Sequence, residues 1–286
     1  MDQNERIIEL LTKKAKMARN DVDQKDEGRK MIETIQKALK RIEEEHQVRI
    51  LFAVESGSRA WGFPSQDSDY DVRFVYIKPL EWYLSIDDKR DVIEEPINDV
   101  LDSSGWDIRK ALKLFRKSNP PLLEWLNSDI VYHDAYGFKE EMLNIRHQVF
   151  SPKSSLHHYL SMAKGNYRDY LQGEQVRIKK YFYVLRPLLA CMWIEKYNTN
   201  PPILFQELLD DLLDDSQIKH IIEELLKRKI AGEELHLEKR IDELHLFIEE
   251  QMTHYTDYAA LQRSVIADPT QQLDELYRKY LKIVWQ

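Results

Sequence analysis

Two aspartates and a glycine–serine pair form the stretch of the sequence with the clearest capacity for chemistry. Gly57-Ser58 is followed, after ten residues, by Asp69-Tyr70-Asp71. If the second segment is a strand, its side chains alternate between two faces, so Asp69 and Asp71 point the same way. Two carboxylates held in parallel repel each other unless a cation lies between them. Mg²⁺ suits these oxygen ligands, because it commonly binds one or two carboxylates together with substrate phosphates.

The glycine–serine pair predicts a phosphate-binding turn. Gly57 has no side chain, so the backbone can approach a phosphate closely at this point. The amide groups that open the following turn can donate hydrogen bonds to the same phosphate. A phosphate-binding turn followed by a metal-binding carboxylate pair is the arrangement of a phosphoryl- or nucleotidyl-transfer site.

These residues carry a family resemblance. The pattern resembles the Gly-Ser…Asp-x-Asp motif of the DNA polymerase β-type nucleotidyltransferases, and Gly57-Ser58-Arg59-Ala60 with Ser68-Asp69 resembles the small "minimal" members. Three later segments are similar to the branch called the RNA repair pathway DNA polymerase beta family: Arg109-Lys110, Asn119-Pro120 and Leu123-Glu124-Trp125-Leu126. The resemblance covers most of the first two hundred residues.

Two plainer roles for the aspartates fit the sequence less well. Asp67, Asp69 and Asp71 could begin a calcium loop of the EF-hand type, but that loop needs glycine where Val72 stands and glutamate where Lys78 stands. Charged residues also alternate along solvated strand edges. The Gly-Ser turn at the family's spacing favours the catalytic interpretation.

The resemblance implies a third carboxylate on a neighbouring strand. Asp99, Asp102 and Asp107 are the candidates. Asp102 follows a strand predicted over residues 97–101, and residues 102–110 resemble the family segment that contains the third ligand. Asp107 has a competing structural role, because it can cap a helix predicted over residues 108–117. We favour Asp102, with Asp99 and Asp107 as alternatives.

The resemblance also implies a mechanism, in which a hydroxyl attacks the α-phosphorus of a nucleoside triphosphate and pyrophosphate leaves. One Mg²⁺ would bind Asp69, Asp71 and Asp102, and a second would bind Asp69 and Asp71; Mn²⁺ is an alternative to Mg²⁺. Gly57 and Ser58 would hold terminal phosphate oxygens, with Arg59 close by.

A later segment supplies further candidates for nucleotide binding. Residues 179–187 resemble the helix on which related enzymes hold the triphosphate and the base, and the candidates on it are Lys179, Lys180, Tyr183 and Arg186. Three of them, at positions 179, 183 and 186, share one helical face. Cationic side chains can neutralise phosphates, and a tyrosine ring can stack on a base. The alternative is that the tyrosines here are core aromatics. Pro187 is expected to kink or interrupt this helix.

Composition bounds the class of protein. The chain of 286 residues is 32% charged and 43% hydrophobic, and Cys191 is its single cysteine, so no intramolecular disulfide can form. No apolar run approaches the length of a membrane span, and the first residues lack the apolar segment of a secretory signal. We therefore expect a cytoplasmic protein without a membrane partner. Residues 151–200 hold eight basic and three acidic side chains, which favours a polyanionic partner.

The elements that must position these residues predict an α+β fold. An apolar run at residues 50–54 predicts one strand, and a second strand contains Asp69 and Asp71 and is completed by residues 74–77. A helix over 27–45 should pack on their sheet. From residue 135 onward almost every segment is helical. We therefore predict a nucleotidyltransferase (polymerase β-like) mixed-sheet domain at residues 1–134 and an all-helical bundle at residues 135–286 that binds substrate or nucleotide.

The leading functional hypothesis is a Mg²⁺-dependent nucleotidyltransferase. Its donor would be an NTP and its acceptor an RNA 3′ end. Transfer to a small molecule or to a protein side chain is the second hypothesis, and a non-catalytic module that binds nucleotide or RNA is the third. The sequence leaves the acceptor, the preferred base, the use of a template and the oligomeric state open.

Overall fold

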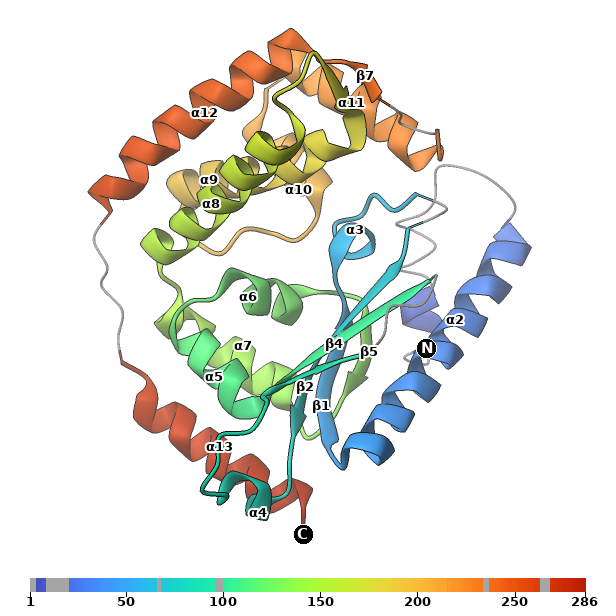
Figure 1. The fold of residues 1–286 in the computed structure, drawn as a ribbon, viewed down its shortest axis with the longest axis vertical. Helices are drawn as coiled ribbons and strands as arrows, with labels where there is room; N and C mark the ends of the chain where they lie inside the picture. Colours follow the sequence, from blue (N-terminus) through green and yellow to red (C-terminus); the bar gives the residue numbers. More distant parts are fainter. Residues whose placement is uncertain are drawn as a thin grey trace.

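A five-stranded mixed sheet positions the aspartates. The computed structural model describes residues 4–8, 21–65, 68–95, 100–214, 216–233, 237–262 and 268–286. The strands are β1 (Arg49–Glu55), β2 (Tyr70–Ile77), β3 (Val92–Glu94), β4 (Leu101–Asp107) and β5 (Val131–Asp134). Their order across the sheet is β3-β4-β2-β1-β5, and β2 and β4 are parallel whereas the other neighbours are antiparallel (Figure 1).

Helices cover both faces of this sheet because its strands are apolar on both sides. One face packs on α2 (Asp21–His46), which buries Ile35 and Ile42 against residues such as Phe74. The other face packs on helices from distant parts of the chain (Figure 1): α5 (Ile108–Arg116), α6 (Pro120–Asn127), α7 (Phe138–Val149) and α13 (Thr270–Val284). The predicted packing of the second helix on the sheet is confirmed.

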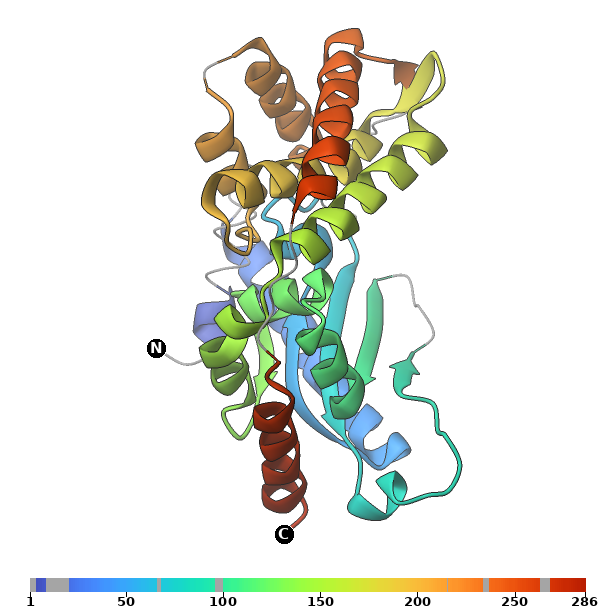
Figure 2. The same cartoon turned by 90° about the vertical axis from the view of Figure 1, so that its left-hand side faces the viewer.

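The second part of the chain is a bundle of helices above the strand ends (Figures 1 and 2). It contains α8 (Pro152–Tyr170), α9 (Tyr181–Tyr197), α10 (Phe205–Leu212), α11 (Gln217–Ile230) and α12 (Asp242–Leu261). Leu185, Leu188 and Phe205 are fully buried in its core. Two short helices, α3 (Gly57–Ala60) and α4 (Leu80–Tyr83), belong to the sheet part.

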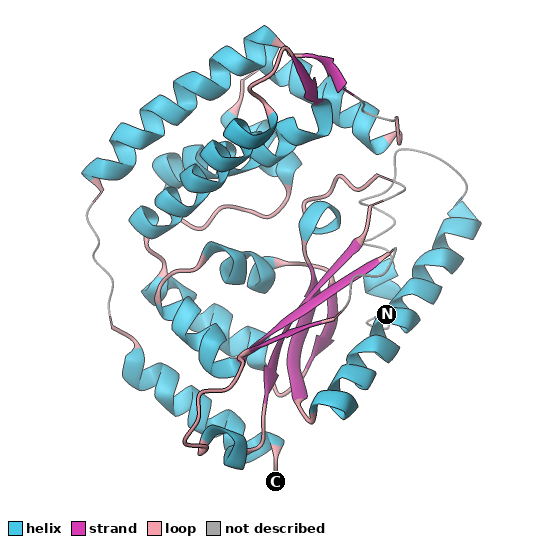
Figure 3. Ribbon diagram, in the orientation of Figure 1, coloured by secondary structure: helices cyan, strands magenta, loops and turns pink. Residues whose placement is uncertain are grey.

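The α+β class is confirmed, and three local predictions need correction. The segment before α9 is not helical, because β6 (Gln175–Arg177) pairs with β7 (Leu237–Lys239) and the 3₁₀ turn η1 (Ile178–Lys180) follows it (Figure 3). Strand β4 begins at Leu101, so Asp102 lies inside a strand rather than after one. Helix α9 runs through Pro187 without interruption.

Two helices predicted for the second domain pack on the sheet part. Phe138 and Met142 of α7, and Leu273 and Tyr280 of α13, are buried in one cluster with Val54 and Val75 of the sheet. The domain boundary after residue 134 stays a prediction.

Candidate active site

A cavity of about 700 Å³ opens between the ends of the central strands and the bundle. It is lined by α3 and the loop before β2, by η1 and α9, and by the end of α11. Its lining residues are Ser56, Gly57, Ser58, Trp61, Ser65, Ser68, Asp69, Asp71, Arg73, Lys179, Tyr183, Lys229, Gly232 and Glu233. The structure thus brings together six residues that the sequence nominated from two segments more than a hundred positions apart: Gly57, Ser58, Asp69, Asp71, Lys179 and Tyr183.

Gly57 and Asp71 approach each other too closely for any side chain at position 57. Gly57 has a left-handed φ of +60°, and a Cβ there would lie 2.0 Å from Asp71 Oδ2. The backbone of the two segments is joined by Ser56 N, which donates to Asp71 O at 2.8 Å. Only glycine allows the turn and the carboxylate to share this space.

Asp71 and Asp102 face each other across the parallel pair of β2 and β4, where they are register partners. Arg73 Nη2 donates to Asp71 Oδ1 at 3.1 Å and to Asp102 Oδ2 at 2.7 Å, and Nη1 donates to the Asp102 carbonyl at 3.0 Å. Burial raises the pKa of Asp71, and the charges of Asp102 and Asp69 raise it further, although Arg73 opposes them. The cluster therefore carries more negative charge than one guanidinium balances.

Of the other two candidates for the third carboxylate, Asp107 has a structural role. Asp107 is fully buried and caps α5, where its Oδ1 accepts from Arg109 N at 2.9 Å and its Oδ2 accepts from Tyr83 Oη at 2.6 Å. Its lone pairs are used inside the fold. Asp99 lies outside the described residues.

The chemistry of the aspartate cluster fits a divalent cation. Asp71 directs Oδ1 to Arg73 and Oδ2 toward Gly57, so one oxygen faces the predicted phosphate turn. Hard carboxylate oxygens beside a phosphate position are the donor set that Mg²⁺ prefers. Elsewhere in the described chain, Glu45, His46 and Glu95 hold ligand atoms within 4.8 Å of one another, a spacing that the three aspartates do not meet. That second cluster already has a cationic partner, because Arg41 donates to Glu95 at 2.6 Å.

A buried glutamate supports the site from below, and sequence reasoning did not assign it a role. Glu55 is fully buried at the end of β1, where its Oε1 accepts from Asp71 N at 2.9 Å and its Oε2 accepts from Tyr132 Oη. Burial raises the pKa of Glu55 to about 7. The signal in the sequence was an acidic residue that closes an apolar strand, since such a residue needs partners inside the fold.

Lys229, near the end of α11, is a second residue that the sequence did not reveal. Its Nζ lines the cavity and donates to Phe63 O at 2.9 Å. Burial, together with the nearby charges of Lys179 and Arg59, lowers the pKa of Lys229 to about 8. No local motif marks this lysine, because its place in the site depends on how the bundle folds back over α3.

Arg59 holds the loop that leads to the aspartates. Its Nη2 donates to Ser68 O at 2.6 Å and its Nε to Asp69 O at 3.2 Å. The guanidinium lies 3.7 Å from the centroid of the Tyr70 ring. These contacts fix the backbone at Asp69, and the side chain of Arg59 is not among those that line the cavity.

The candidates on η1 and α9 divide into two groups. Lys180 Nζ lies 4.0 Å from the ring centroid of Tyr170 and 4.8 Å from that of Tyr183, and Tyr183 remains 41% exposed at the cavity. Arg186 is different, because it is only 3% exposed and donates to Glu124 Oε1 at 2.9 Å. Its guanidinium also lies 4.5 Å from the ring centroid of Trp61. Arg186 therefore connects α9 to α6 behind the cavity wall.

Comparison with known proteins identifies the family of the chain. The model of the RNA repair pathway DNA polymerase beta family matches residues 31–279. The chain belongs to this family. It is 54% identical over 248 residues to the uncharacterized protein YcgL of Bacillus subtilis (strain 168), an alignment that covers 87% of this chain and 95% of YcgL. The resemblance expected from the sequence is confirmed.

A further comparison is with a solved structure. The chain is similar to a nucleotidyltransferase-like protein from Exiguobacterium sibiricum 255-15, with 12% identity, a TM-score of 0.30 and coverage of 85% of this chain and 89% of that one. Among the described residues, none of the helices combines the length and the apolar character that crossing a membrane requires.

Proposed function

We propose that the protein is a Mg²⁺-dependent nucleotidyltransferase that transfers an NMP from an NTP, such as ATP, to an acceptor hydroxyl on an RNA 3′ end. The observation that carries the proposal is that carboxylates and ammonium groups line one cavity. Asp69 and Asp71 line it together with Lys179 and Lys229. Asp102 is the register partner of Asp71 on the adjacent strand. A triphosphate with a divalent cation at its α-phosphate has the complementary distribution of charge.

The residues of the cavity divide the work of this reaction. Asp69, Asp71 and Asp102 would hold one Mg²⁺, and Asp69 with Asp71 would hold a second. When bound, the ions would neutralise phosphate charge and lower the pKa of the attacking hydroxyl. The backbone of Gly57 and the hydroxyl of Ser58 would hold the terminal phosphates.

The proposed transfer is a single displacement at phosphorus. The acceptor oxygen forms a bond to the α-phosphorus, the bond from that phosphorus to the bridging oxygen breaks, and the hydroxyl proton is released. Pyrophosphate departs toward Lys179 and Lys229, whose positive charges stabilise it. The protein thus contributes mainly positioning and electrostatics, as expected for phosphoryl-type transfer.

The proposal of an RNA acceptor rests on the family description and on the side chains around Tyr183, which lines the cavity. The exposed rings of Tyr183 and Tyr170 both lie close to the ammonium group of Lys180. Aromatic rings interleaved with cations bind single-stranded nucleic acid, because bases stack on the rings while phosphates meet the charges. On α5, Lys110 pairs with Asp91 at 2.9 Å and the guanidinium of Arg109 lies 4.9 Å from the ring centroid of Tyr83, so both side chains already have partners within the protein.

The test is incubation of the protein with each α-³²P-labelled NTP, Mg²⁺ and a mixed RNA pool. We expect the label in RNA, with release of pyrophosphate, and no transfer by Asp69→Asn. Label that is found only in small compounds or in protein would show the second hypothesis to be correct. Nucleotide binding without pyrophosphate release would identify a non-catalytic binding module.

A further inference from the structure

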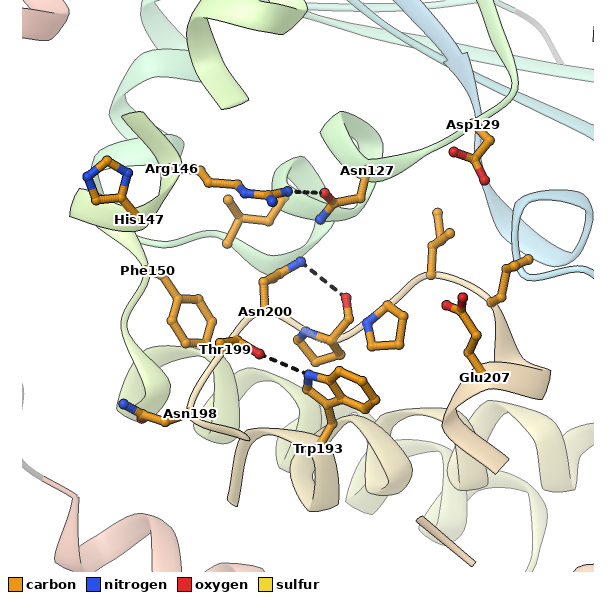
Figure 4. Close-up of a pocket in the computed structure, with 15 residues that line it drawn as sticks. Asn127, Asp129, Arg146, His147, Phe150, Trp193, Asn198, Thr199, Asn200 and Glu207 are labelled. Atoms are coloured by element: carbon orange, nitrogen blue, oxygen red, sulfur yellow. Dashed lines mark hydrogen bonds between the residues drawn. The ribbon is translucent and has the colours of Figure 1, made fainter. Parts of the chain in front are cut away.

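A second large cavity lies between the two parts of the chain, and the proposed function does not use it. Its volume is about 690 Å³, similar to the 700 Å³ of the candidate active site. One wall comes from the end of α6 and from α7, and the other from α9 and from residues 198–204 that link α9 to α10 (Figure 4). A connection between two helices does not by itself explain the chemistry of the side chains around the cavity.

The charged side chains of this cavity are separated by sign. Figure 4 shows Arg146 and His147 at one end, and Asp129 and Glu207 at the other. Arg146 Nη1 donates to the side-chain oxygen of Asn127, which directs the guanidinium along the cavity wall. A ligand that spans the cavity would thus contact a cationic group at one end and hydrogen-bond acceptors at the other.

The middle of the cavity offers a flat ring. Trp193 is held in place because its Nε1 donates to Thr199 Oγ1 at 3.1 Å. Asn200 offers no acceptor to a ligand here, since its Nδ2 donates to Pro201 O at 3.2 Å and its Oδ1 is buried behind the cavity surface. The ring of Trp193 is therefore the group that a flat ligand can contact in this part of the cavity.

We propose that this cavity binds a purine nucleotide, either as a free 5′-monophosphate or as the terminal nucleotide of an RNA. The phosphate would lie against Arg146, since a guanidinium binds phosphate oxygens in pairs. The base would stack on Trp193, as bases do on indole rings in nucleic-acid sites. Its N–H groups would donate to the carboxylate of Glu207, which is an acceptor at the other end of the cavity.

The acceptors at the far end define the preferred base. Guanine presents an N–H and an adjacent amino group on one edge, so it can donate twice to a carboxylate, whereas adenine offers one amino group. Uracil presents two carbonyl oxygens on either side of a single N–H, so most of its edge would face Asp129 or Glu207 without a donor. The order of affinity expected is therefore GMP, then AMP, then UMP.

The second cavity is separate from the active site but shares a wall with it. Leu204 lines the second cavity, and the next residue, Phe205, donates its backbone N–H to Trp61 O at 2.9 Å. The side chain of Trp61 lines the active-site cavity. The two ligands would therefore occupy opposite sides of one thin partition.

The test titrates GMP, AMP, UMP and inorganic phosphate into the whole protein by isothermal calorimetry with EDTA present. The same titrations are made with Lys179→Ala, which weakens phosphate binding in the active-site cavity, and with Arg146→Gln. We expect GMP to bind wild type and Lys179→Ala equally, and Arg146→Gln to bind it at least tenfold more weakly. Arg168→Gln is the matched control, since Arg168 is an exposed arginine paired with Asp169, and it should bind GMP as wild type does. Thermal melting checks that each variant is folded.

The outcomes decide the proposal independently of catalysis. GMP binding that is lost in Lys179→Ala and kept in Arg146→Gln would place the ligand in the active site and overturn the proposal. Inorganic phosphate that binds as tightly as GMP, or an absence of GMP binding at millimolar concentration, would also overturn it. A trinucleotide that ends in guanosine, titrated in parallel, distinguishes the two sources, since tighter binding than GMP indicates an RNA end and weaker binding a free nucleotide.

Discussion

Asp71 and Asp102 are direct neighbours on two parallel strands, and the same nitrogen of Arg73 donates a hydrogen bond to each of them. The guanidinium offsets part of the repulsion between the two carboxylates, so they can be held close together in the folded protein. Because Arg73 takes only Oδ1 of Asp71, Oδ2 remains directed toward Gly57. Arg73 therefore supplies a positive charge inside the protein, and Oδ2 of Asp71 is left to bind a cation.

Asp71→Asn should abolish transfer without unfolding the protein. Loss of a metal ligand removes several kcal/mol of transition-state stabilisation, which corresponds to a rate at least about a thousandfold lower. The thermal unfolding temperature should stay the same or rise, because burial raises the pKa of Asp71 and therefore disfavours its charged form. Labelled-NTP transfer and thermal melting measure the two effects. Asp91→Asn, at a half-exposed position away from the cavity, is the control and should keep its activity.

Binding of a nucleoside triphosphate should take up protons at alkaline pH. Burial and neighbouring positive charges lower the pKa of Lys229 to about 8, and a bound polyphosphate raises it again, because the opposite charge favours the ammonium form. Affinity should therefore fall as the pH rises above 8. Calorimetry in two buffers of different ionisation enthalpy measures the protons. Lys229→Arg, which stays charged, should bind without this uptake, and an equal uptake by that variant would assign the protons to another group.

Gly57→Ala should damage both the fold and the site. A Cβ at this position would meet Asp71 Oδ2 at 2.0 Å, and alanine is strained at a φ of +60°. Backbone strain alone costs about 1–3 kcal/mol, and displacement of Asp71 adds a loss of activity. Gly165→Ala is the matched control, because a Cβ at Gly165 in α8 meets nothing within 4 Å, and it should stabilise the helix by about 0.5–1 kcal/mol. Urea denaturation compares the two variants, and equal stabilities would contradict this expectation.

Glu55→Gln should gain stability over wild type as the pH rises. Burial raises the folded-state pKa of Glu55 from 4.5 to about 7, so protonation favours the folded state and ionisation opposes it. The destabilisation caused by ionised Glu55 begins near pH 4.5 and is complete above about pH 7. It corresponds to about 3 kcal/mol of unfolding free energy. Glutamine avoids it, since its oxygen can accept from Asp71 N and its amide can donate to Tyr132. Unfolding free energies at pH 5 to 8 in EDTA test this, and a difference that does not change with pH would contradict it.

Arg186 and Glu124 should behave as a coupled structural pair. Arg186→Met leaves a carboxylate without its buried partner and should cost about 3–5 kcal/mol of unfolding free energy. The double variant Arg186→Met with Glu124→Gln should recover much of this loss, which a double-mutant cycle measures. If Arg186 instead holds the nucleotide, the double variant would regain stability and still fail to bind NTP.

Local patterns in the sequence were sufficient to predict much of the part of the site that the sheet and its turns contribute. A turn glycine and capping at Asp107 depend on neighbours within a few residues, and both led to the observed geometry. Strand alternation was only partly correct, because β2 begins at Tyr70 and Asp69 lies just before it. The position of Asp102 could not be predicted from local patterns. Its pairing with Asp71 depends on a parallel register between strands about thirty residues apart, and only the family resemblance indicated it.

The bundle side of the site was harder to predict, because its residues are chosen by long-range packing. Lys229 reaches the cavity only because α11 lies against Phe63, and no pattern around Lys229 reports this contact. Arg186 shares a helical face with Lys179 in sequence, but η1 changes the phase of the helix between them, and the arginine is buried against Glu124. The pairing of β6 with β7, which precedes η1, also explains why the segment before α9 is not helical as predicted.

Helix α13 returns from the bundle to pack beneath the sheet, next to α5 and α7 (Figure 1). The backbone therefore passes between the two parts twice, once between α7 and α8 and once between α12 and α13. The bundle is thus an insertion within the sheet part, and the core beneath the sheet needs the chain from both sides of that insertion. A chain cut short before α13 would leave Phe138 and Met142 of α7 without Leu273 and Tyr280, so the last helix of the chain stabilises the sheet that holds the aspartates.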